Sequence, residues 1–451
     1  MTKVGLFLLS NYRNSWQETG IIEELSKQSE LTIFTSQIVA NGLKSSDRIK
    51  VLVLPDVKSS RATSFLQKIA LVNRRHLSSS FIFRMKRQIF GDLRITSSRF
   101  TKTQKLYAVL YNLRRLIVFS VKNHVVLLAY VPWIGRLLET MFRQLFLSKM
   151  QPFTESTHVE LDVAIIPTAA IEDATFELVQ RLKLTSIKTI LCIENWDNLT
   201  SKSILIALPD RLMVMGDRCK TYGTEIQRVS GNSIWVAGLP RFNRYRELAK
   251  TYLEKHDEIF SILYLGCAVP HNEKDLLDQL QQRLGEKIPE GSFQIRYKPH
   301  PARQLRFFER RELPASVQVI NSASNAVGFN AIPSINSEHM QVILDADLVI
   351  ATPTSMALES MILRKKTIID ATDDGIHRTT AALSMKGYTH LRDLRSIKGL
   401  DFGTDIDSLV EKILSCYLEF HKHSSQPYDL SNLIELKAKS YTDHLAKLIS
   451  E

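Results

Sequence analysis

The sequence has 451 residues, a length typical of two or three domains that are each large enough to bury a core. Hydrophobic residues make up 44% and charged residues 24%, which excludes a largely disordered or fibrous protein. The four cysteines form no C-x-x-C pair, which argues against a disulfide framework, a zinc ribbon or a thioredoxin-type site and favours a reduced, cytosolic compartment.

The positive charge of the chain is concentrated in one segment. Residues 61–150 contain 17 lysines and arginines and only two acids, Asp92 and Glu139, which gives a local net charge of +15. Because the whole chain has a net charge of +12, the remainder is slightly acidic. We therefore interpret the basicity as a property of this segment and not of the whole protein.

Short, β-rich apolar runs alternate with amphipathic stretches of helical length, which is the pattern of βαβ units and parallel sheets. The first series predicts strands at 4–10, 31–36, 51–57, 161–168, 189–195, 211–217 and 233–238, and helices near 16–28, 171–183 and 218–229. The apolar core of the first strand is too short for a signal peptide. The basic segment interrupts this series, so we expect it to be an insertion in a doubly wound domain.

A second series follows a polar, charged stretch. It predicts strands at 260–268, 293–301, 317–321, 346–352 and 366–372, helices at 273–283, 338–345 and 355–364, and two final helical stretches near 406–420 and 430–449. We expect an α/β fold with two doubly wound, Rossmann-like domains that face a cleft. The predicted boundaries are 1–240 for the first domain, with a basic helical insertion at 61–158, 241–258 for a linker, 259–405 for the second domain and 406–451 for helices that cross back.

The stretch 345–370 predicts a phosphate-binding helix start. A buried strand ends at Pro353, and Thr354 and Ser355 then offer hydroxyl groups at the N-cap of the next helix. The free N–H groups and the positive end of that helix favour an anion such as phosphate. Glu359 lies one turn further along the same face, where its carboxylate could accept hydrogen bonds from a ribose diol. The alternative is a plain capped helix with a solvated Glu359; neither G-x-G-x-x-G nor a P-loop motif is present here.

A cationic turn follows the strand predicted at 293–301. His300 lies between two prolines that stiffen the turn, with Lys298 and Arg303 on either side. Such a turn could neutralise a diphosphate leaving group, by charge or by an imidazole hydrogen bond, and the alternative is a structural histidine. No second histidine, cysteine or carboxylate lies at ligand spacing, so we expect no metal ion.

Two carboxylates lie at the end of the strand predicted at 189–195. Glu194 and Asp197 flank Trp196, so burial could raise the pKa of one of them and make it a general base for a sugar hydroxyl. The alternative for both acids is capping of the next helix, and Trp196 either stacks on a sugar or fills the core. Further along, Arg241 either faces the cleft or lies at the hinge.

At these residues the sequence resembles the bacterial surface-polysaccharide glycosyltransferases of the GT-B fold, in particular a group with a WDNLT-K stretch. The similarity covers residues 160–375 well. The matching residues are Trp196, Asp197, Asn198, Leu199, Thr200 and Lys202 for that stretch, Gly238, Pro240 and Phe242 for a G-x-P-x-F segment, 263–265 for an LYL strand, and His300 and Pro301 for an HP pair. The resemblance implies that Thr354, Ser355 and Glu359 contact the nucleotide of a sugar donor.

We therefore expect a glycosyltransferase that moves a sugar from a nucleotide-sugar to a growing, lipid-linked surface glycan, without a cofactor. The candidates are Asp197, Glu194 and His300 for catalysis, Lys298, His300, Arg303, Thr354, Ser355 and Glu359 for donor binding, and Trp196, Asn198 and Arg241 for the acceptor side of the cleft. A carboxylate base is needed if the reaction inverts the anomeric centre, and a retaining reaction would need none. The sequence leaves both outcomes open.

Other enzyme classes share some of these motifs. CMP-sugar transferases for Kdo or sialic acid, and CDP-glycerol glycerophosphotransferases, also contain an HP pair and a Ser/Thr pair, but they usually carry an acidic D/E-D/E-G motif in the first domain. Here 373–375 places such a motif in the second domain, so we interpret the match as accidental and leave the donor open. A sugar-nucleotide epimerase is a further alternative, but an enzyme that acts on a free nucleotide-sugar has no use for a long basic insertion, which argues against this class.

The basic insertion predicts a membrane-surface element. Its longest uncharged run, 123–135, has 13 residues, fewer than the about 20 that a bilayer core requires. The bases and large apolar residues that alternate around it include Arg114, Arg115, Lys122, Arg136, Arg143, Trp133, Phe142, Leu145 and Phe146. We expect a cytoplasmic enzyme, peripheral on the inner face of the cell membrane, with an anionic lipid surface and no nucleic acid as partner. One alternative is a helical subdomain that packs its apolar residues internally and exposes its bases. The non-enzyme alternative is a nucleic-acid-binding protein, against which the apolar runs between the bases argue.

Overall fold

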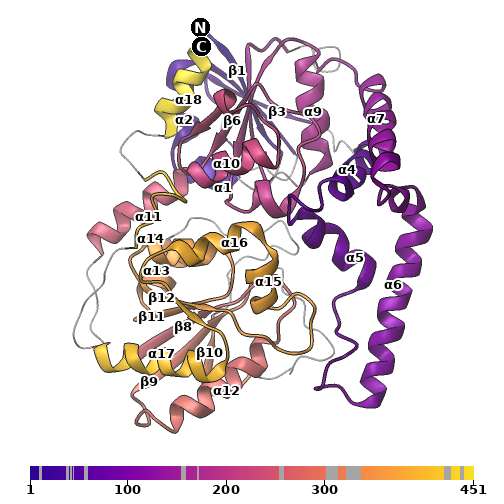
Figure 1. Ribbon diagram of the computed structural model, residues 1–451. Helices are drawn as coiled ribbons and strands as arrows, with labels where there is room; N and C mark the ends of the chain where they lie inside the picture. Colours follow the sequence, from indigo (N-terminus) through magenta and orange to yellow (C-terminus); the bar gives the residue numbers. More distant parts are fainter. Residues whose placement is uncertain are drawn as a thin grey trace. The chain divides into compact units, whose positions relative to one another are not determined.

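The computed structural model describes residues 1–9, 13–36, 40, 43, 45–54, 59–153, 159–169, 172–252, 258–300, 313–320, 337–420, 428–436 and 441–451 (Figure 1). The chain folds into two compact units, and each unit is assembled from separate stretches of sequence. The first unit comprises Met1–Ile89, Ile117–Arg241 and Ser431–Glu451, and the second comprises Phe90–Leu116 and Phe242–Leu430.

The first unit is built on a parallel sheet of seven strands in the order β3-β2-β1-β4-β5-β6-β7. The strands are β1 (Lys3–Leu8), β2 (Glu30–Thr35), β3 (Ile49–Val53), β4 (Val163–Thr168), β5 (Lys188–Ile193), β6 (Arg211–Val214) and β7 (Ile234–Val236). Central strands such as β4 are buried along their whole length, which explains why they appear in the sequence as continuous apolar runs.

Helices of the first unit connect these strands. They are α1 (Arg13–Glu18), α2 (Ile21–Gln28), α4 (Arg61–Asn73), α7 (Pro132–Ser148), α9 (Asp173–Lys183), α10 (Asp217–Glu225) and α18 (Tyr441–Ser450), with short turns η1 (Ile82–Lys86), η2 (Asn198–Lys202) and η3 (Gly231–Ser233). The insertion predicted between the third and fourth strands is helical. In it, α7 packs closely on α4, because a Cβ on Gly135 would lie 2.2 Å from Oδ1 of Asn73, whose amide donates to the Gly135 carbonyl at 3.0 Å.

The insertion is divided between the two units, whereas we expected all of it in the first domain. It continues through α5 (Arg87–Phe90) into α6 (Lys102–Leu128), which has a kink at Asn123. Residues Phe90–Leu116 belong to the second unit. There Leu93 forms a β-bridge with His377, and the Arg94 N–H donates to the Ile376 carbonyl at 2.8 Å.

The second unit contains a parallel sheet of six strands in the order β10-β9-β8-β11-β12-β13. The strands are β8 (Phe260–Leu265), β9 (Phe293–Lys298), β10 (Val317–Val319), β11 (Leu348–Ala351), β12 (Lys366–Asp370) and β13 (Asp401–Gly403). Both sheets therefore contain the strand order 3-2-1-4-5-6 of doubly wound folds. The predicted class, an α/β protein with two doubly wound, Rossmann-like domains, is confirmed.

The helices of the second unit are α12 (Glu273–Gly285), α13 (Ser337–Leu344), α14 (Ser355–Ile362), α15 (Ala381–Gly387), α16 (Thr389–Asp393) and α17 (Ile406–Glu419), with the turn η4 (Leu394–Ser396). The sequence analysis predicted neither β13 nor the two short helices that precede it. A further helix, α11 (Pro240–Thr251), occupies much of the predicted linker.

The C-terminal stretch predicted at 406–451 is divided as well. Helix α17 contributes to the core of the second unit, whereas α18 belongs to the first unit. Before α18, residues 431–436 run against two glycines of the first unit, since a Cβ on Gly216 would lie 2.1 Å from the Leu433 carbonyl oxygen and one on Gly238 would lie 2.4 Å from that of Glu435. The close approach of two backbones leaves no room for a side chain at either position.

Candidate functional site

The strand order of the second sheet reverses between β8 and β11, and open α/β sheets bind ligands outside the carboxyl ends of the strands at such a point. The two strand ends are joined by Thr352, whose N–H and hydroxyl both donate to the Leu265 carbonyl, at 3.1 and 2.8 Å. The loop before α12 and the start of α14 therefore leave the sheet side by side. The candidate site is built on these two connections.

Helix α14 begins at this edge as the sequence predicts. Thr354 is its N-cap residue and has an extended backbone, but its side chain makes no capping hydrogen bond. Its Oγ1 is buried and has no hydrogen-bond partner among the described residues. Ser355 is half-buried, and Glu359 is buried, so the alternative of a solvated glutamate does not describe this helix. The first N–H groups of any helix lack intrahelical partners, and here an unsatisfied hydroxyl accompanies them.

The cationic turn lies on the same edge of the sheet, at the end of β9. Lys298 is the last residue of that strand and is buried, and its carbonyl accepts a hydrogen bond from the Gly266 N–H at 3.0 Å. His300 follows two residues later and is half-buried. Arg303 lies outside the described residues. Strand β8 separates β9 from β11, so the cations and the start of α14 share an edge but not adjacent strands.

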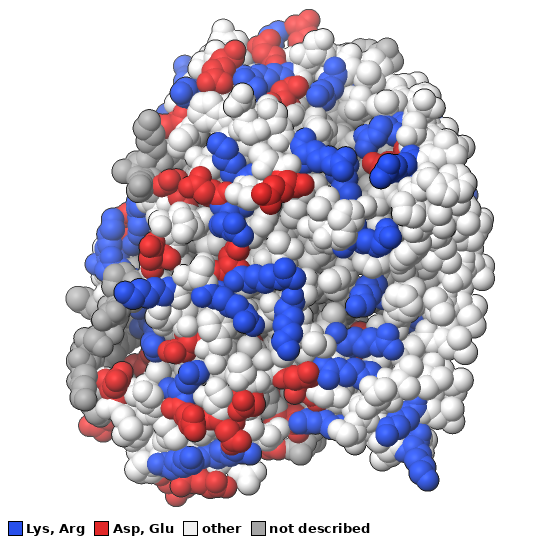
Figure 2. All heavy atoms as spheres, viewed as in Figure 1, with Lys and Arg blue, Asp and Glu red and all other residues white. Residues whose placement is uncertain are grey.

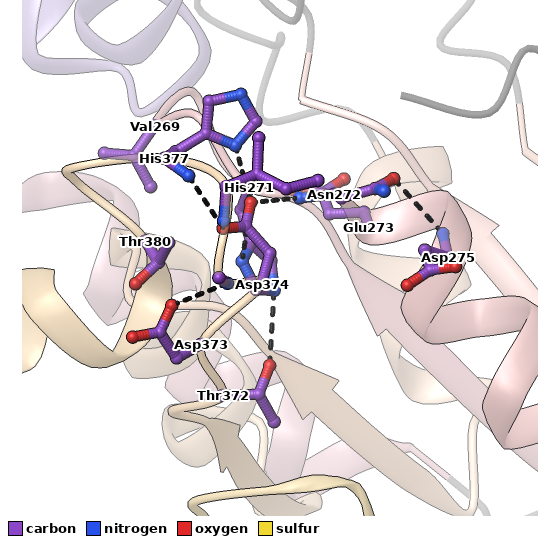
Figure 3. Close-up of polar contacts among 12 residues, drawn as sticks. Val269, His271, Asn272, Glu273, Asp275, Thr372, Asp373, Asp374, His377 and Thr380 are labelled. Carbon is purple, nitrogen blue, oxygen red and sulfur yellow. Dashed lines mark hydrogen bonds and ion pairs between the residues drawn. The ribbon is translucent and has the colours of Figure 1, made fainter. Parts of the chain in front are cut away.

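Asp374 is the centre of a buried polar cluster that the sequence analysis missed (Figure 3). Its Oδ2 accepts from Nδ1 of His377 at 2.5 Å and from the Asn272 N–H at 3.0 Å. Its Oδ1 accepts from the N–H groups of Ile376 and His377, at 2.8 and 2.9 Å. An ionised carboxylate only accepts, so Nδ1 of His377 carries the proton. Nε2 of this fully buried ring has no hydrogen-bond partner in the described part of the chain.

His271 lies at the other side of the same cluster. Its Nε2 is 3.3 Å from both Oδ2 of Asp370 and Oγ1 of Thr372, and its Nδ1 is 4.0 Å from Oδ2 of Asp374. Burial acts to lower the pKa of His271, but the neighbouring carboxylates outweigh it and leave that pKa raised. Burial acts to raise the pKa values of Asp370 and Asp374, yet both are lowered. His271 and hydrogen bonds from Tyr264 and Thr372 lower the pKa of Asp370, and His377 and His271 lower that of Asp374. The cluster thus ties the loop after β12 to the segment before α12 by charge.

A second carboxylate fixes the start of α12. Glu273 accepts from the hydroxyl of Tyr297 at 2.6 Å and from the N–H of Cys267 at 2.8 Å. Asn272 caps the helix by accepting from the Asp275 N–H. The loop between β8 and α12 is therefore held at both ends.

The sequence contained a signal for part of this cluster. Asp370 lies in the strand predicted at 366–372, and Asp374 belongs to the acidic motif that we interpreted as accidental. His271 lies in the loop that follows β8, as His300 lies in the loop that follows β9. What the sequence lacks is any local pattern that connects residue 271 with residue 374, because only the order of strands in the folded sheet brings them together.

The first unit contains the other group of candidates, at the end of β5. Glu194 is fully buried; its Oε1 accepts from Nε1 of Trp16 at 2.8 Å, and its carbonyl accepts from the guanidinium of Arg241 at 2.8 Å. Its Oε2 has no hydrogen-bond partner among the described residues. Burial raises the pKa of Glu194 to about 7, although Arg241 and Trp16 act to lower it. Glu194 and Arg241 are therefore buried residues whose hydrogen bond connects the end of β5 to the start of α11.

Asp197 is the more accessible of the two predicted carboxylates. It precedes the π-helical turn η2 and forms an ion pair with Lys202 at 3.0 Å. Such turns are rare and recur at functional sites. The amide of Asn198 donates to the Thr168 carbonyl at 3.1 Å, and Trp196 is buried, so its ring fills the core. The WDNLT-K stretch therefore forms the turn that follows β5 and is tied to the end of β4.

No group of three or more histidine, cysteine or acidic side chains in the described ranges is arranged to hold a metal ion. This includes the Asp374 cluster, whose carboxylate oxygens already accept hydrogen bonds.

Comparisons with known proteins assign no family. No family model matches the chain, and no curated protein matches its sequence. Among solved structures, the chain is similar to UDP-GlcNAc 2-epimerase from Methanocaldococcus jannaschii, at 11% identity and a TM-score of 0.49 over 100% of both chains. It is also similar to a glycosyltransferase from Rickettsia africae, at 9% identity and a TM-score of 0.43 over 100% of this chain and 93% of the other. A third is the wall teichoic acid polymerase TagF, at 10% identity and a TM-score of 0.43 over 99% and 88%. Identities of 9–11% and TM-scores below 0.5 do not assign a function, so the function has to be argued from the residues of this chain.

Proposed function

We propose that this protein is a glycosyltransferase that uses a nucleotide-sugar donor and extends a surface glycan. One observation carries the proposal: the start of α14 lies at the switch point of a doubly wound sheet and presents a buried hydroxyl of Thr354 that has no hydrogen-bond partner among the described residues. A phosphate oxygen bound there would accept hydrogen bonds from that hydroxyl and from the first N–H groups of the helix.

The neighbouring side chains supply the remaining donor contacts in this proposal. Lys298 and His300, at the end of β9, would neutralise the negative charge that develops on the leaving diphosphate. Glu359 would accept hydrogen bonds from the ribose hydroxyls. These groups would then hold the transferred sugar at the carboxyl edge of the second sheet.

The acceptor hydroxyl needs a proton acceptor if the reaction inverts the anomeric centre. Asp197 fits this role better than Glu194, because Glu194 is sealed inside the first unit and partly protonated near neutral pH. Glu194 and Arg241 would then act as positioning residues. Asn198 holds the same corner through its bond to β4.

A thermal-shift screen of the full chain against UDP, GDP, CDP, CMP and ADP tests the donor site. A nucleotide at a hundredfold excess over its dissociation constant should stabilise the fold by about 2.7 kcal/mol. The matching nucleosides, which lack phosphate, should have little effect. If none of the five nucleotides shifts the melting transition, the proposal of a donor site at the start of α14 is wrong.

The same screen separates the enzyme classes. Stabilisation by CMP or CDP alone would favour a CMP-sugar transferase or a CDP-glycerol transferase. A change in the sugar of a UDP-sugar without any acceptor, followed by NMR, would indicate an epimerase, the activity named for the M. jannaschii protein. Transfer that persists in EDTA would support our expectation of a metal-independent reaction.

A further inference from the structure

Helices α6 and α7 expose a continuous series of large apolar side chains. Most of the large hydrophobic residues that the described part of the chain leaves exposed lie between Leu106 and Leu147. We define the α6–α7 surface by Ile117, Val118, Val121, Leu128, Val131, Trp133, Leu137, Met141, Leu145 and Leu147, all in the first unit. On α7, Trp133, Leu137, Met141 and Leu145 recur every four residues and so share one face.

The opposite face of α7 accounts for its attachment to the protein. Gly135 lies against Asn73, Phe146 is buried, and the ring of Phe142 stacks on Phe65 at 5.5 Å. The expectation that Phe142 and Phe146 lie in a membrane surface is therefore wrong, because both pack inward. The outward apolar face is not needed to hold α7 in place.

The charges around this surface are basic. Lys122, Arg136 and Lys149 are exposed beside it. The acid of α7, Glu139, is turned inward, where it accepts from the amide of Asn73 at 2.8 Å and pairs with Arg143 at 3.3 Å. In Figure 2, viewed as in Figure 1, the right-hand edge along these helices is largely white with blue side chains and very little red.

Arg143 differs from the other bases. Its guanidinium donates to the Ile206 carbonyl at 2.8 Å and contacts Glu139, so it fastens α7 to the first unit. The first half of α6, in the second unit, repeats the composition of the surface: Leu106, Leu110 and Leu113 are exposed, as are Lys102, Lys105 and Arg114. The basic and apolar character is thus a property of both helices.

No single described helix is both long and apolar enough to cross a bilayer. The pair α6 and α7, bent by 94° at the break between them, passes the same test of length and composition only when the two are taken together. An apolar stripe flanked by bases and aromatic side chains is the composition of helices that lie in the interface of a membrane.

We propose that the α6–α7 surface docks on an anionic lipid bilayer. Trp133, Leu137 and Met141 enter the boundary between headgroups and acyl chains, and Lys122, Arg136 and Lys149 contact the anionic headgroups. The basic side chains favour anionic over neutral lipids. The aliphatic face offers few hydrogen-bonding groups and can therefore be buried among acyl chains. A lipid-linked acceptor would be encountered on such a surface, but the docking itself does not depend on the proposed transfer reaction.

Tryptophan fluorescence of the full chain with vesicles tests this directly. Trp16 and Trp196 are buried and Trp235 is half-buried, whereas Trp133 is 68% exposed. Vesicles of 70% phosphatidylcholine and 30% phosphatidylglycerol should shift the emission to the blue, and Trp133→Phe should abolish the shift. Vesicles of phosphatidylcholine alone, or addition of 0.5 M salt, should reduce it strongly, because screening shortens the reach of surface charge.

Sedimentation with the same vesicles measures the contribution of charge. Combined Lys122→Glu, Arg136→Glu and Lys149→Glu should weaken binding at least tenfold. Combined Lys386→Glu, Arg395→Glu and Lys398→Glu makes the same change of charge at exposed sites of the second unit and should leave binding close to that of the parent.

The apolar face has its own matched pair. Combined Trp133→Ser, Leu137→Ser and Met141→Ser should abolish binding, whereas Leu184→Ser, Leu208→Ser and Leu418→Ser, at other exposed apolar positions, should not. Equal pelleting of both sets, or equal binding to neutral and anionic vesicles, would overturn the proposal. The proposal would also be overturned if the parent chain did not bind vesicles but formed a dimer that the three serine substitutions at Trp133, Leu137 and Met141 dissociated. The surface would then be covered by a second copy of the chain. Because binding is measured without substrate, its failure leaves the proposed transfer reaction untouched.

Discussion

Nδ1 of His377 lies 2.5 Å from Oδ2 of Asp374, and the same carboxylate also accepts the N–H groups of Asn272, Ile376 and His377. The pair fixes the loop that follows β12 at the carboxyl edge of the second sheet. It also leaves Nε2 of His377, a buried ring nitrogen, without a hydrogen-bond partner among the described residues. The conformation of this loop therefore depends on the ionised state of the Asp374 carboxylate.

Asp374→Asn should destabilise the protein by about 2–3 kcal/mol at pH 6, because it removes a buried charge that several donors surround. The pKa of Asp374 is lowered in the folded state. Its contribution is therefore present above the unfolded pKa of 3.8 and is lost as the pH falls through the folded value. Urea unfolding at pH 6 and below pH 4 should show the difference between variant and parent shrinking in acid. Asp47→Asn, at an exposed aspartate, should show no such pattern.

Glu194→Gln should have the opposite pH dependence. The pKa of Glu194 is raised from 4.5 to about 7, so the neutral form stabilises the fold below pH 4.5 and this contribution is lost as the pH rises towards 7. The amide should therefore make the protein more stable than the parent at pH 8, by a few kcal/mol at most, and flatten its stability between pH 5 and 8. Exposed Glu23→Gln is the control. A variant less stable than the parent at pH 8 would contradict a partly protonated Glu194.

Thr354→Val tests the phosphate site at the start of α14. The substitution keeps the shape and removes the hydroxyl, so it should cost the folded protein little. It should weaken the binding of the stabilising nucleotide by about 1.5–3 kcal/mol, the value of a hydrogen bond to a charged group. Isothermal titration calorimetry measures this, with Thr224→Val as the control in the first unit. Unchanged nucleotide affinity would show that the Thr354 hydroxyl does not contact the phosphate.

His300→Ala should lower turnover about 100-fold and change nucleotide affinity much less, since a group that serves the leaving phosphate acts most strongly as charge develops. Steady-state kinetics together with calorimetry separate the two effects. A loss of nucleotide affinity with unchanged turnover would place His300 in ground-state binding, and unchanged affinity together with unchanged turnover would make it structural.

Gly238→Ala should destabilise the first unit by about 2–4 kcal/mol. Gly238 has a φ of +75°, which other residues rarely adopt, and the new Cβ would lie 2.4 Å from the Glu435 carbonyl oxygen. Gly285→Ala, where no atom lies within 4 Å of the added Cβ, should be neutral or slightly stabilising. Thermal unfolding of the two variants provides the comparison, and similar melting temperatures would contradict the close approach of residues 431–436.

The sequence was sufficient to predict the strands of both sheets and the insertion because buried parallel strands are continuous apolar runs with helices between them. It missed β13, which has only three residues, and the short helices α15 and α16, because each is too short for a periodic signal. It placed Thr354 at a helix start correctly, since capping is a local property. It missed His271, because its partners Asp370 and Asp374 are distant in sequence. It also missed His377, because a histidine three residues after an aspartate is no signal of a buried pair by itself. It could not show that Phe142 points inward and Trp133 outward, since both lie on an apolar helix.

The division of the chain between its two units has a consequence for synthesis. Helix α18, whose Tyr441 packs its ring against that of Trp16 at 5.9 Å, completes the first unit but is translated after the whole of the second unit. Domains usually fold in the order in which they leave the ribosome. Here the six-stranded sheet can form while Trp16 is still uncovered, so the unit whose first strand is made earliest is the last to be finished. A nascent chain halted before residue 441 would expose that unfinished face to chaperones and proteases, even with every strand of both sheets already made.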